Sequence, residues 1–217
     1  MTPVLYNYFR SSSSYRVRIA MNLKGLDYRY VAVHLNRNGG EQFADSFKEL
    51  NPQAMVPVLS DNDVQVGQSL AIMEYLEERY PGTASLLPGS IGDRAYVRQL
   101  SLEMACEIHP LNNLRVLKFL TGPLALPEEA KMQWIRHWTE AGLAALEKEV
   151  SRSPKRGRFC FGDSPTMADC CLVPQLFNAR RFNTDLAAYP TLVEIDRHCA
   201  EVEAIARAHP DAQPDSE

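Results

Sequence analysis

Short apolar runs separated by polar segments fill the first eighty residues and predict strands and helices in alternation. Four runs rich in β-branched and aromatic residues predict strands; they span residues 4–9, 28–35, 56–60 and 64–66. A helix is expected over residues 12–24, ended by Gly25, and another over residues 69–79. Because a strand–helix–strand unit of this length pairs its strands in parallel, residues 1–82 predict a small α/β domain.

The strand pattern stops after residue 82, and the rest of the chain is helical in pattern. Residues 83–89 contain proline and glycine and are predicted to be a linker. Residues 90–210 predict an all-α domain; its expected helices are 92–120 with a break at Pro110, one that starts at Pro127, 166–182 and 190–209. The acidic residues 211–217 are predicted to form a loose tail. The expected fold class is therefore α+β, with an α/β domain followed by an all-α domain.

The composition is that of an ordinary globular protein, with 45% hydrophobic and 23% charged residues, and it narrows the range of partners. A net charge of −4 argues against nucleic acid, which requires a concentrated basic surface. No apolar run approaches the ~18 residues of a membrane-spanning helix, and none at the start resembles an export signal, so we expect a cytoplasmic protein outside the membrane. The five cysteines are then expected to be reduced thiols, and no cluster of His, Cys and Asp has the spacing of a metal site.

Three polar segments that border the predicted strands carry the candidate chemistry. The four serines at residues 11–14 precede a helix, where hydroxyls and free amides form a plain cap or bind an anion. Val56 and Pro57 lead into a strand, and a cis bond between them would turn the Val56 backbone outward to pair with a peptide. Gln68 and Ser69 open the second helix, with Ser69 as a candidate N-cap suited to a carboxylate. All three segments are expected at one end of the sheet.

Thr166 and Asp169 form an S/T-x-x-D pattern directly before an apolar run. Each of the two side chains can accept a hydrogen bond from a backbone amide that the first turn of a helix leaves unpaired. We interpret this pair as the start of a helix and not as an active site.

Five phrases of the chain, in order and at matching separations, are similar to those of a known family. They are YFRSSSSYRVRIAMNLKGLDY, LNPQAMVPVL, QSLAIMEYLEERYP, GDSPTMADCCLVPQ and YPTL. From about residue 5 to residue 215, the chain resembles the zeta class of glutathione transferases, the family that includes maleylacetoacetate isomerase. The resemblance implies a glutathione transferase fold, with a thioredoxin-like N-terminal domain, an all-helical C-terminal domain, assembly as a homodimer, and glutathione as the cofactor.

The resemblance implies that the serine run meets the sulfur of glutathione. Ser11 or Ser12 would donate a hydrogen bond to the thiolate, and a hydroxyl at a helix N-terminus lowers the pKa of a thiol because it favours the anion. The family usually has a cysteine where this chain has Ser13, which stays among the expected glutathione contacts. The departure puts in doubt any role that depends on a protein thiol, such as dehydroascorbate chemistry.

The remaining glutathione contacts are also implied by the resemblance, position by position. Gln42 would touch the glycine end of the ligand. Val56, before a cis-Pro57, would pair with the cysteinyl backbone, and Gln68 and Ser69 would hold the γ-glutamyl carboxylate. Three residues of the helical domain are expected to reach the ligand: His109, Asn113 and Arg115.

The expected reaction is a glutathione-dependent cis–trans isomerisation of maleylacetoacetate to fumarylacetoacetate, a step in the breakdown of tyrosine and phenylalanine. The thiolate would add to the cis double bond, and its expulsion after rotation about the new single bond would regenerate glutathione. The expected catalytic residues are Ser11, Ser12 and Arg10.

Arginine is the residue expected to bind the dicarboxylate or diketo-acid substrate, because its guanidinium is planar, bidentate and always charged. The candidates for this role are Arg10, Arg181 and Arg115. Three other arginines are interpreted as solvated surface charges: Arg16, Arg18 and Arg180.

Three alternatives remain open at the level of sequence. The first keeps the chemistry and changes the substrate to maleylpyruvate, an intermediate of gentisate breakdown. The second is a general zeta-class glutathione transferase or α-haloacid dehalogenase. The third is a binding module without catalysis, and the intact serine run, Val56-Pro57 and Gln68-Ser69 argue against it because a module would not need all three.

Overall fold

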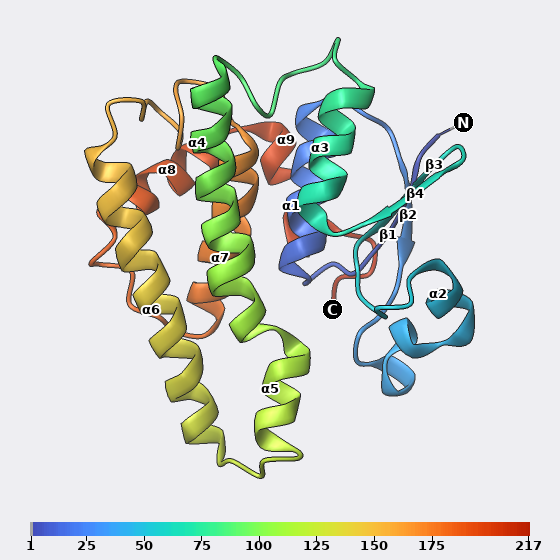
Figure 1. The fold of residues 1–217 in the computed structure, drawn as a ribbon. Coiled ribbons are helices and arrows are strands. Elements are labelled where there is room, and N and C mark those ends of the chain that lie inside the picture. The colour runs from blue at the N-terminus through green and yellow to red at the C-terminus, as the bar shows by residue number, and fades with distance from the viewer. Residues whose placement is uncertain (1) are drawn as a thin grey trace. The chain divides into compact units, whose positions relative to one another are not determined.

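The strands of the N-terminal part form one mixed sheet (Figure 1). The computed structural model describes residues 2–217, and its strands are β1 (Val4–Asn7), β2 (Arg29–Ala32), β3 (Val58–Asp61) and β4 (Val64–Gly67). Their order in the sheet is β2-β1-β3-β4. Strands β1 and β2 are parallel, whereas β3 runs antiparallel to both β1 and β4. The predicted parallel unit is confirmed, and the later strands extend it as an antiparallel hairpin.

Helices cover both faces of this sheet. The helices of this part are α1 (Ser12–Leu23), α2 (Asp45–Leu50) and α3 (Ser69–Arg79). Helices α1 and α3 pack side by side on one face (Figure 1). Successive side chains of β1 point to opposite faces, and Tyr6 meets Phe47 of α2 edge-on, with 6.5 Å between the ring centroids. The resulting α/β/α sandwich is the expected thioredoxin-like domain.

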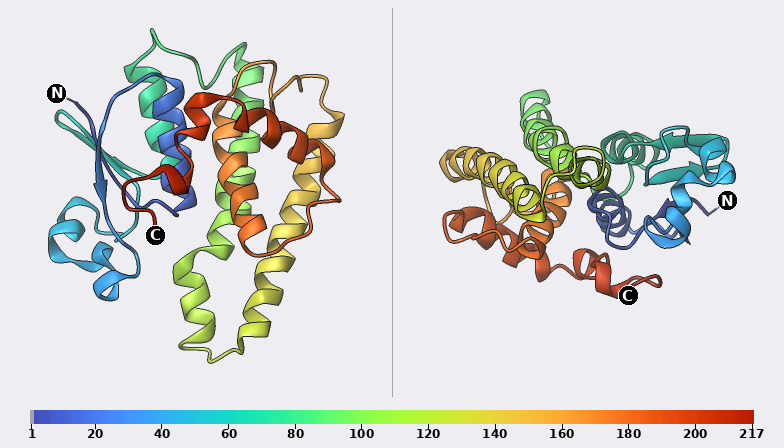
Figure 2. Two further views of the ribbon diagram at one scale, coloured as in Figure 1. Left: turned by 180° about the vertical axis from the view of Figure 1, so that it is seen from behind. Right: turned by 90° about the horizontal axis from the view of Figure 1, so that it is seen from below.

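The C-terminal end of the chain belongs to this sandwich, which differs from the sequence expectation. The described residues form two compact units: residues 2–86 with Ala200–Glu217, and Leu87–Cys199. Helix α9 (Glu203–Ala206) packs against α1, and the chain then runs on past it (Figure 2). Residues 200–210 therefore do not extend the helical domain, and residues 211–217 are not a loose tail.

Apolar burial and side-chain hydrogen bonds explain why this end of the chain is ordered. Ile205 and Ala208 are almost completely buried. The Gln213 amide donates to the carbonyl oxygens of Arg207 and His209, at 2.9 and 2.8 Å. The acidic, proline-containing composition of residues 211–217 does not predict these contacts. The partners are backbone groups or lie elsewhere in the sequence.

The second unit is helical throughout its regular structure. Its α-helices are α4 (Ile91–Leu102), α5 (Leu114–Thr121), α6 (Glu128–Arg152), α7 (Met167–Arg181) and α8 (Pro190–Ala200), the last of which ends at the boundary between the units. Between α4 and α5 the chain forms a π-helical segment, Glu103–Ile108, and a 3₁₀ turn, His109–Asn112. The break expected at Pro110 is thus confirmed. No helix among the described residues is both long enough and apolar enough to cross a membrane.

Helix α7 begins at the predicted capping box. The Asp169 carboxylate accepts hydrogen bonds from the backbone N–H and the hydroxyl of Thr166, at 2.7 and 2.9 Å. Its other oxygen accepts the backbone N–H of Cys160 at 2.9 Å. Burial raises the pKa of Asp169, while these donors act in the opposite direction. The interpretation of this pair as a helix start is confirmed.

Candidate functional site

The pairing register of the sheet brings three of the predicted site segments to one end. Tyr6, near the end of β1, pairs with Val58, the first residue of β3. Val58 pairs in turn with Gly67, the last residue of β4. The residues that follow β1, precede β3 and follow β4 therefore lie at the same end of the sheet; they are residues 8–14, Val56 with Pro57, and Gln68 with Ser69.

The serine run forms the N-terminus of α1. Ser11 is the N-cap, with extended backbone angles (φ −71°, ψ 120°), and its hydroxyl accepts the backbone N–H of Ser14 at 3.3 Å. Ser14 is buried, and its own hydroxyl accepts the backbone N–H of Tyr8 at 3.4 Å. Ser12 is largely buried, and Ser13 is half-buried. The run therefore caps α1 and keeps hydroxyls and first-turn amides where the helix dipole favours an anion.

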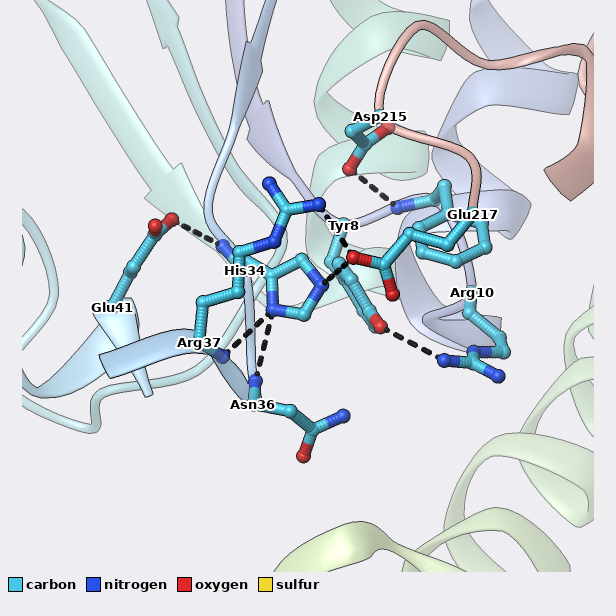
Figure 3. Close-up of polar contacts among 9 residues, drawn as sticks. Tyr8, Arg10, His34, Asn36, Arg37, Glu41, Asp215 and Glu217 are labelled. Atoms are coloured by element: carbon cyan, nitrogen blue, oxygen red, sulfur yellow. Dashed lines mark hydrogen bonds and ion pairs between the residues drawn. The ribbon is translucent and has the colours of Figure 1, made fainter. Parts of the chain in front are cut away.

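Arg10 lies directly before this cap. Its guanidinium donates to the phenolic oxygen of Tyr8 at 3.3 Å, as Figure 3 shows. It also lies 5.1 Å from the centroid of the Phe9 ring. These contacts leave Arg10 half-buried beside the serine run, where a guanidinium can meet a carboxylate.

The Val56–Pro57 peptide bond is cis, the geometry that the resemblance implied. The loop before it is held by Asn51, whose amide donates to the carbonyl oxygen of Met55 at 2.7 Å. Val56 packs against a buried cluster that includes Phe47 of α2, and it precedes β3 at the sheet end described above. The segment is therefore fixed on both of its sides.

Gln68 and Ser69 begin α3, with one difference from the prediction. Gln68 is the N-cap, in the left-handed region (φ 66°), and Ser69 is the first helical residue. The Gln68 side chain is exposed and donates to Gln53 at 2.8 Å. Ser69 is buried, and its hydroxyl accepts a hydrogen bond from the guanidinium of Arg16 at 3.3 Å. The expectation that Ser69 is the cap is wrong, because the chain turns into the helix one residue earlier.

Gln42 is buried in the 3₁₀ turn Glu41–Phe43. Its amide oxygen has no hydrogen-bond partner among residues 2–217. The turn is tied to the residues after β2, because the Glu41 carboxylate accepts the backbone N–H of His34 at 2.6 Å (Figure 3). An unsatisfied buried acceptor costs free energy, so it is a natural partner for a donor that a ligand brings.

The other predicted site residues belong to the helical unit. Asn113 is the N-cap of α5 and accepts the backbone N–H of Arg115 at 3.1 Å, and Arg115 itself is exposed. Arg181 is the exposed last residue of α7, with its guanidinium 5.0 Å from the centroid of the Phe182 ring. His109 opens the 3₁₀ turn before α5.

Two arginines that the sequence led us to read as surface charges are buried instead. Arg16 is 2% exposed, and Arg18 is completely buried. Both lie on α1 and donate to polar groups in the sandwich, Arg16 to Ser69 and Arg18 to backbone carbonyl groups. The interpretation as surface charges is wrong for both residues. It is confirmed for Arg180, which is exposed and whose guanidinium lies 2.7 Å from the carboxylate of Asp196. The sequence pattern does not predict the burial of Arg18, because its partners are the Asn7 side chain and the backbone carbonyl groups of Tyr8, Phe9 and Ala208.

Family comparisons decide what kind of protein has this site. Residues 5–84 match the model of the glutathione S-transferase N-terminal domain, and residues 139–196 match that of the C-terminal domain. The chain belongs to the glutathione S-transferase family. A solved bacterial glutathione S-transferase of the zeta class, the holo form of maleyl pyruvate isomerase, superposes with a TM-score of 0.95 at 48% identity, over 99% of this chain and 100% of that one. The chain is therefore a zeta-class glutathione S-transferase.

Two other relatives of this zeta-class protein carry the name of a second isomerase. A probable maleylacetoacetate isomerase of Vibrio cholerae is 45% identical over 216 residues, which is 100% of this chain and 99% of the relative. The maleylacetoacetate isomerase of Methylobacterium extorquens, solved with bound malonate and glutathione, superposes with a TM-score of 0.94 at 40% identity and covers 99% of each chain. Among residues 2–217, no group of three or more His, Cys, Asp and Glu side chains is arranged to hold a metal ion.

Proposed function

We propose that the protein is a glutathione-dependent cis–trans isomerase. The observation that carries this proposal is the sheet register, which gathers the N-terminus of α1, the cis Val56–Pro57 bond and the N-terminus of α3 at one end of the sheet. Glutathione is a peptide with two carboxylates and a thiol. A helix N-terminus suits an anion, and an outward-facing backbone suits a peptide, so these three segments match the groups of this ligand.

Each part of glutathione has a proposed partner in this chain. Val56 supplies backbone groups for the cysteinyl residue, and Gln68 and Ser69 at the start of α3 bind the γ-glutamyl carboxylate. The amide oxygen of Gln42, which lacks a partner among the described residues, accepts a hydrogen bond from the N–H of the glycine residue. The family resemblance implies three further contacts with glutathione: His109, Asn113 and Arg115.

The serine run controls the protonation of the sulfur. Bound glutathione supplies a thiolate that adds to the cis double bond and leaves after rotation about the new single bond, so that it is not consumed. Ser11 or Ser12 donates a hydrogen bond to the sulfur, and the dipole of α1 favours its negative charge. Ser13 contributes its backbone to the same helix N-terminus, and its hydroxyl cannot take over the role of a thiol.

Arginines hold the substrate. Arg10 lies beside the serine run and binds a carboxylate or the negative charge that develops on the substrate oxygen. Arg181, at the end of α7, binds a second carboxylate, and Arg115, at the start of α5, is the third candidate. A permanently charged guanidinium is suited to this task because it stabilises negative charge without exchanging a proton.

The preferred substrate is maleylacetoacetate, in tyrosine and phenylalanine breakdown. Support comes from two relatives that are named maleylacetoacetate isomerase, those of Vibrio cholerae and Methylobacterium extorquens. Each matches this chain over nearly its whole length. Maleylpyruvate is the second candidate, because the zeta-class maleyl pyruvate isomerase is similar to this chain at 48% identity. The two substrates require the same bond changes and differ at the end far from the double bond, where maleylacetoacetate has one more methylene group before its second carboxylate.

Isomerisation of both substrates, measured side by side with and without glutathione, tests this proposal. We expect fast, glutathione-dependent turnover of maleylacetoacetate and slower turnover of maleylpyruvate. The reverse order would assign the second substrate. If the protein were retained on immobilised glutathione but isomerised neither compound, the site would stand and the reaction would be a conjugation or a dehalogenation. A protein that passed through the glutathione column would be a binding module of another kind.

A further inference from the structure

The loop that leads from β1 to the N-cap of α1 is held by two charged side chains that the proposed chemistry does not use. This β1–α1 loop comprises residues 8–11, and it carries Arg10 and Ser11. Tyr8 and Phe9 are each 3% exposed, so their peptide groups must find partners inside the protein. Among residues 8–14, the Ser14 hydroxyl accepts the Tyr8 N–H and the Ser11 N–H donates to the Tyr8 carbonyl; the charged partners are Arg18 on α1 and Asp215 near the end of the chain.

Arg18 binds the carbonyl side of the loop. Its guanidinium donates to the carbonyl oxygens of Tyr8 and Phe9, at 3.3 and 2.7 Å. The same group donates to the side chain of Asn7 at 3.1 Å and to the carbonyl oxygen of Ala208 at 3.2 Å. A completely buried guanidinium requires such acceptors, because it brings its charge into the protein interior. Arg18 therefore joins the β1–α1 loop to the C-terminal segment.

Asp215 binds the amide side of the same loop. Its carboxylate accepts the backbone N–H of Phe9 at 3.1 Å and also accepts a hydrogen bond from the Tyr30 hydroxyl. Burial raises the pKa of Tyr30, and the bond to Asp215 raises it further, so the phenol stays a donor. The peptide group on each side of Phe9 is thus fixed, the N–H by Asp215 and the carbonyl by Arg18.

The segment that carries Asp215, residues 207–217, is here called the C-terminal strap. It is anchored at Gln213, as described above, and again at Glu217, whose carboxylate lies 2.5 Å from the Arg37 guanidinium and 3.2 Å from Nε2 of His34 (Figure 3). Nδ1 of His34 accepts the backbone N–H of Arg37 at 2.9 Å, so in the neutral imidazole the proton is on Nε2, toward Glu217. The strap is therefore attached on both sides of Asp215.

We propose that Asp215 and Arg18 are positioning residues for the reaction, and that the C-terminal strap sets the place of the Ser11 hydroxyl and the Arg10 guanidinium. This inference rests on the proposed function, because it needs the serine run to face the glutathione sulfur. Neither side chain touches the sulfur or the substrate in this role; each acts through the peptide groups of Tyr8 and Phe9. A displacement of about 1 Å in such a loop can lower a rate about a hundredfold.

The test compares three variants of the strap with the unaltered protein. Asp215→Ala removes the acceptor for both Phe9 and Tyr30. Asp215→Asn keeps one acceptor oxygen and adds an NH2 group that can donate a hydrogen bond to the hydroxyl oxygen of Tyr30. It is therefore the conservative variant. Asp211→Ala is the matched control, since Asp211 lies in the same strap and its side chain is 81% exposed. Each variant is measured for thermal unfolding, for the affinity of glutathione, for the pKa of the bound thiol by its ultraviolet thiolate absorbance, and for kcat and KM.

We expect Asp215→Ala to lower kcat by about tenfold or more and to raise the pKa of the bound thiol at temperatures where the protein is folded. Asp215→Asn should recover most of both losses, and Asp211→Ala should match the unaltered protein. If Asp215→Ala lowered only the unfolding temperature, with kcat and the thiol pKa of the folded protein unchanged, the inference would be overturned. Failure of the unaltered protein to bind glutathione would instead overturn the proposed function, and this inference with it.

Discussion

The buried guanidinium of Arg16 donates a hydrogen bond to the hydroxyl of Ser69 at 3.3 Å and so links α1 to the first residue of α3. Under the proposed function, Ser69 binds the γ-glutamyl carboxylate, and the positive charge of Arg16 contacts the Ser69 hydroxyl. We predict that Ser69→Ala weakens glutathione binding by about tenfold or more, since a hydrogen bond to a charged group contributes about 1.5–3 kcal/mol. Isothermal calorimetry with glutathione measures the loss.

The same linkage makes a prediction for a pair of variants. Arg16→Met should also weaken binding, and the double variant with Ser69→Ala should lose less than the product of the two single effects, because both residues serve one carboxylate. Losses that multiply fully would show that Arg16 supports the fold and not the ligand. Unfolding curves of each variant separate the two cases.

Neighbouring arginines at the end of α7 give a matched pair for the substrate. We predict that Arg181→Ala lowers kcat/KM by about a hundredfold, since a lost contact to a carboxylate costs about 2–3 kcal/mol in the transition state. Arg180→Ala is the control, because the Arg180 side chain lies 2.7 Å from Asp196 at the protein surface. Near-normal turnover in Arg181→Ala would remove this residue from the mechanism.

Local patterns predicted the elements of the fold and much of the candidate site. Alternating apolar runs locate the four strands within a few residues, and the serine run and the Thr166–Asp169 pair mark the starts of α1 and α7. These features depend on residues close in sequence, such as the bond from Ser14 to Ser11. The parallel pairing of β1 and β2 could also be expected, because a strand–helix–strand unit of this length joins parallel strands.

Long-range polar contacts were not predictable in this way. Arg18 was interpreted as a surface charge and residues 211–217 as a loose tail, yet the Phe9 amide binds Asp215 across 206 residues of chain. Burying a guanidinium is favourable only when distant backbone carbonyls converge on it, and hydropathy carries no information about that convergence. Two of the departures from expectation, Arg18 and residues 211–217, are therefore places where a charged side chain binds buried backbone groups.

Gly142 of α6 lies so close to Ile108 that a Cβ added there would stand 2.3 Å from Cγ1 of Ile108. We predict that Gly142→Ala destabilises the protein by about 1–2 kcal/mol, because overpacking costs about 1–3 kcal/mol and the higher helix propensity of alanine returns up to about 1 kcal/mol. Urea unfolding measures the difference.

A double-mutant cycle distinguishes this clash from other causes. Ile108→Ala creates room for the added methyl group, so Gly142→Ala should be neutral or stabilising in that background. An equal loss of stability in both backgrounds would show that the contact with Ile108 is not the reason for the glycine.

Glu149 of α6 and Glu103 both contact the side chain of Gln99. The amide of Gln99 donates to both carboxyl groups, at 2.6 Å to Glu149 and 3.1 Å to Glu103. Burial, followed by the hydrogen bond and the negative charge of Glu103, together raise the pKa of Glu149 from a usual 4.5 to about 7. Glu149 therefore keeps its proton in the folded protein at a pH where the unfolded chain has lost it.

This raised pKa predicts a loss of stability as the pH rises. Between about pH 4.5 and pH 7 the folded state binds more protons than the unfolded state, so the free energy of unfolding falls across this window and the loss is complete above it. We expect Glu149→Gln, which stays neutral, to be about as stable as the unaltered protein at pH 4.5 and more stable by about 1 kcal/mol at pH 8, a value reduced for solvent screening. Glu103→Gln should also make the free energy of unfolding depend less on pH, because it removes the negative charge beside Glu149. Urea unfolding at both pH values measures the effect, and parallel stability profiles for Glu149→Gln and the unaltered protein would show that folding does not raise the pKa of Glu149.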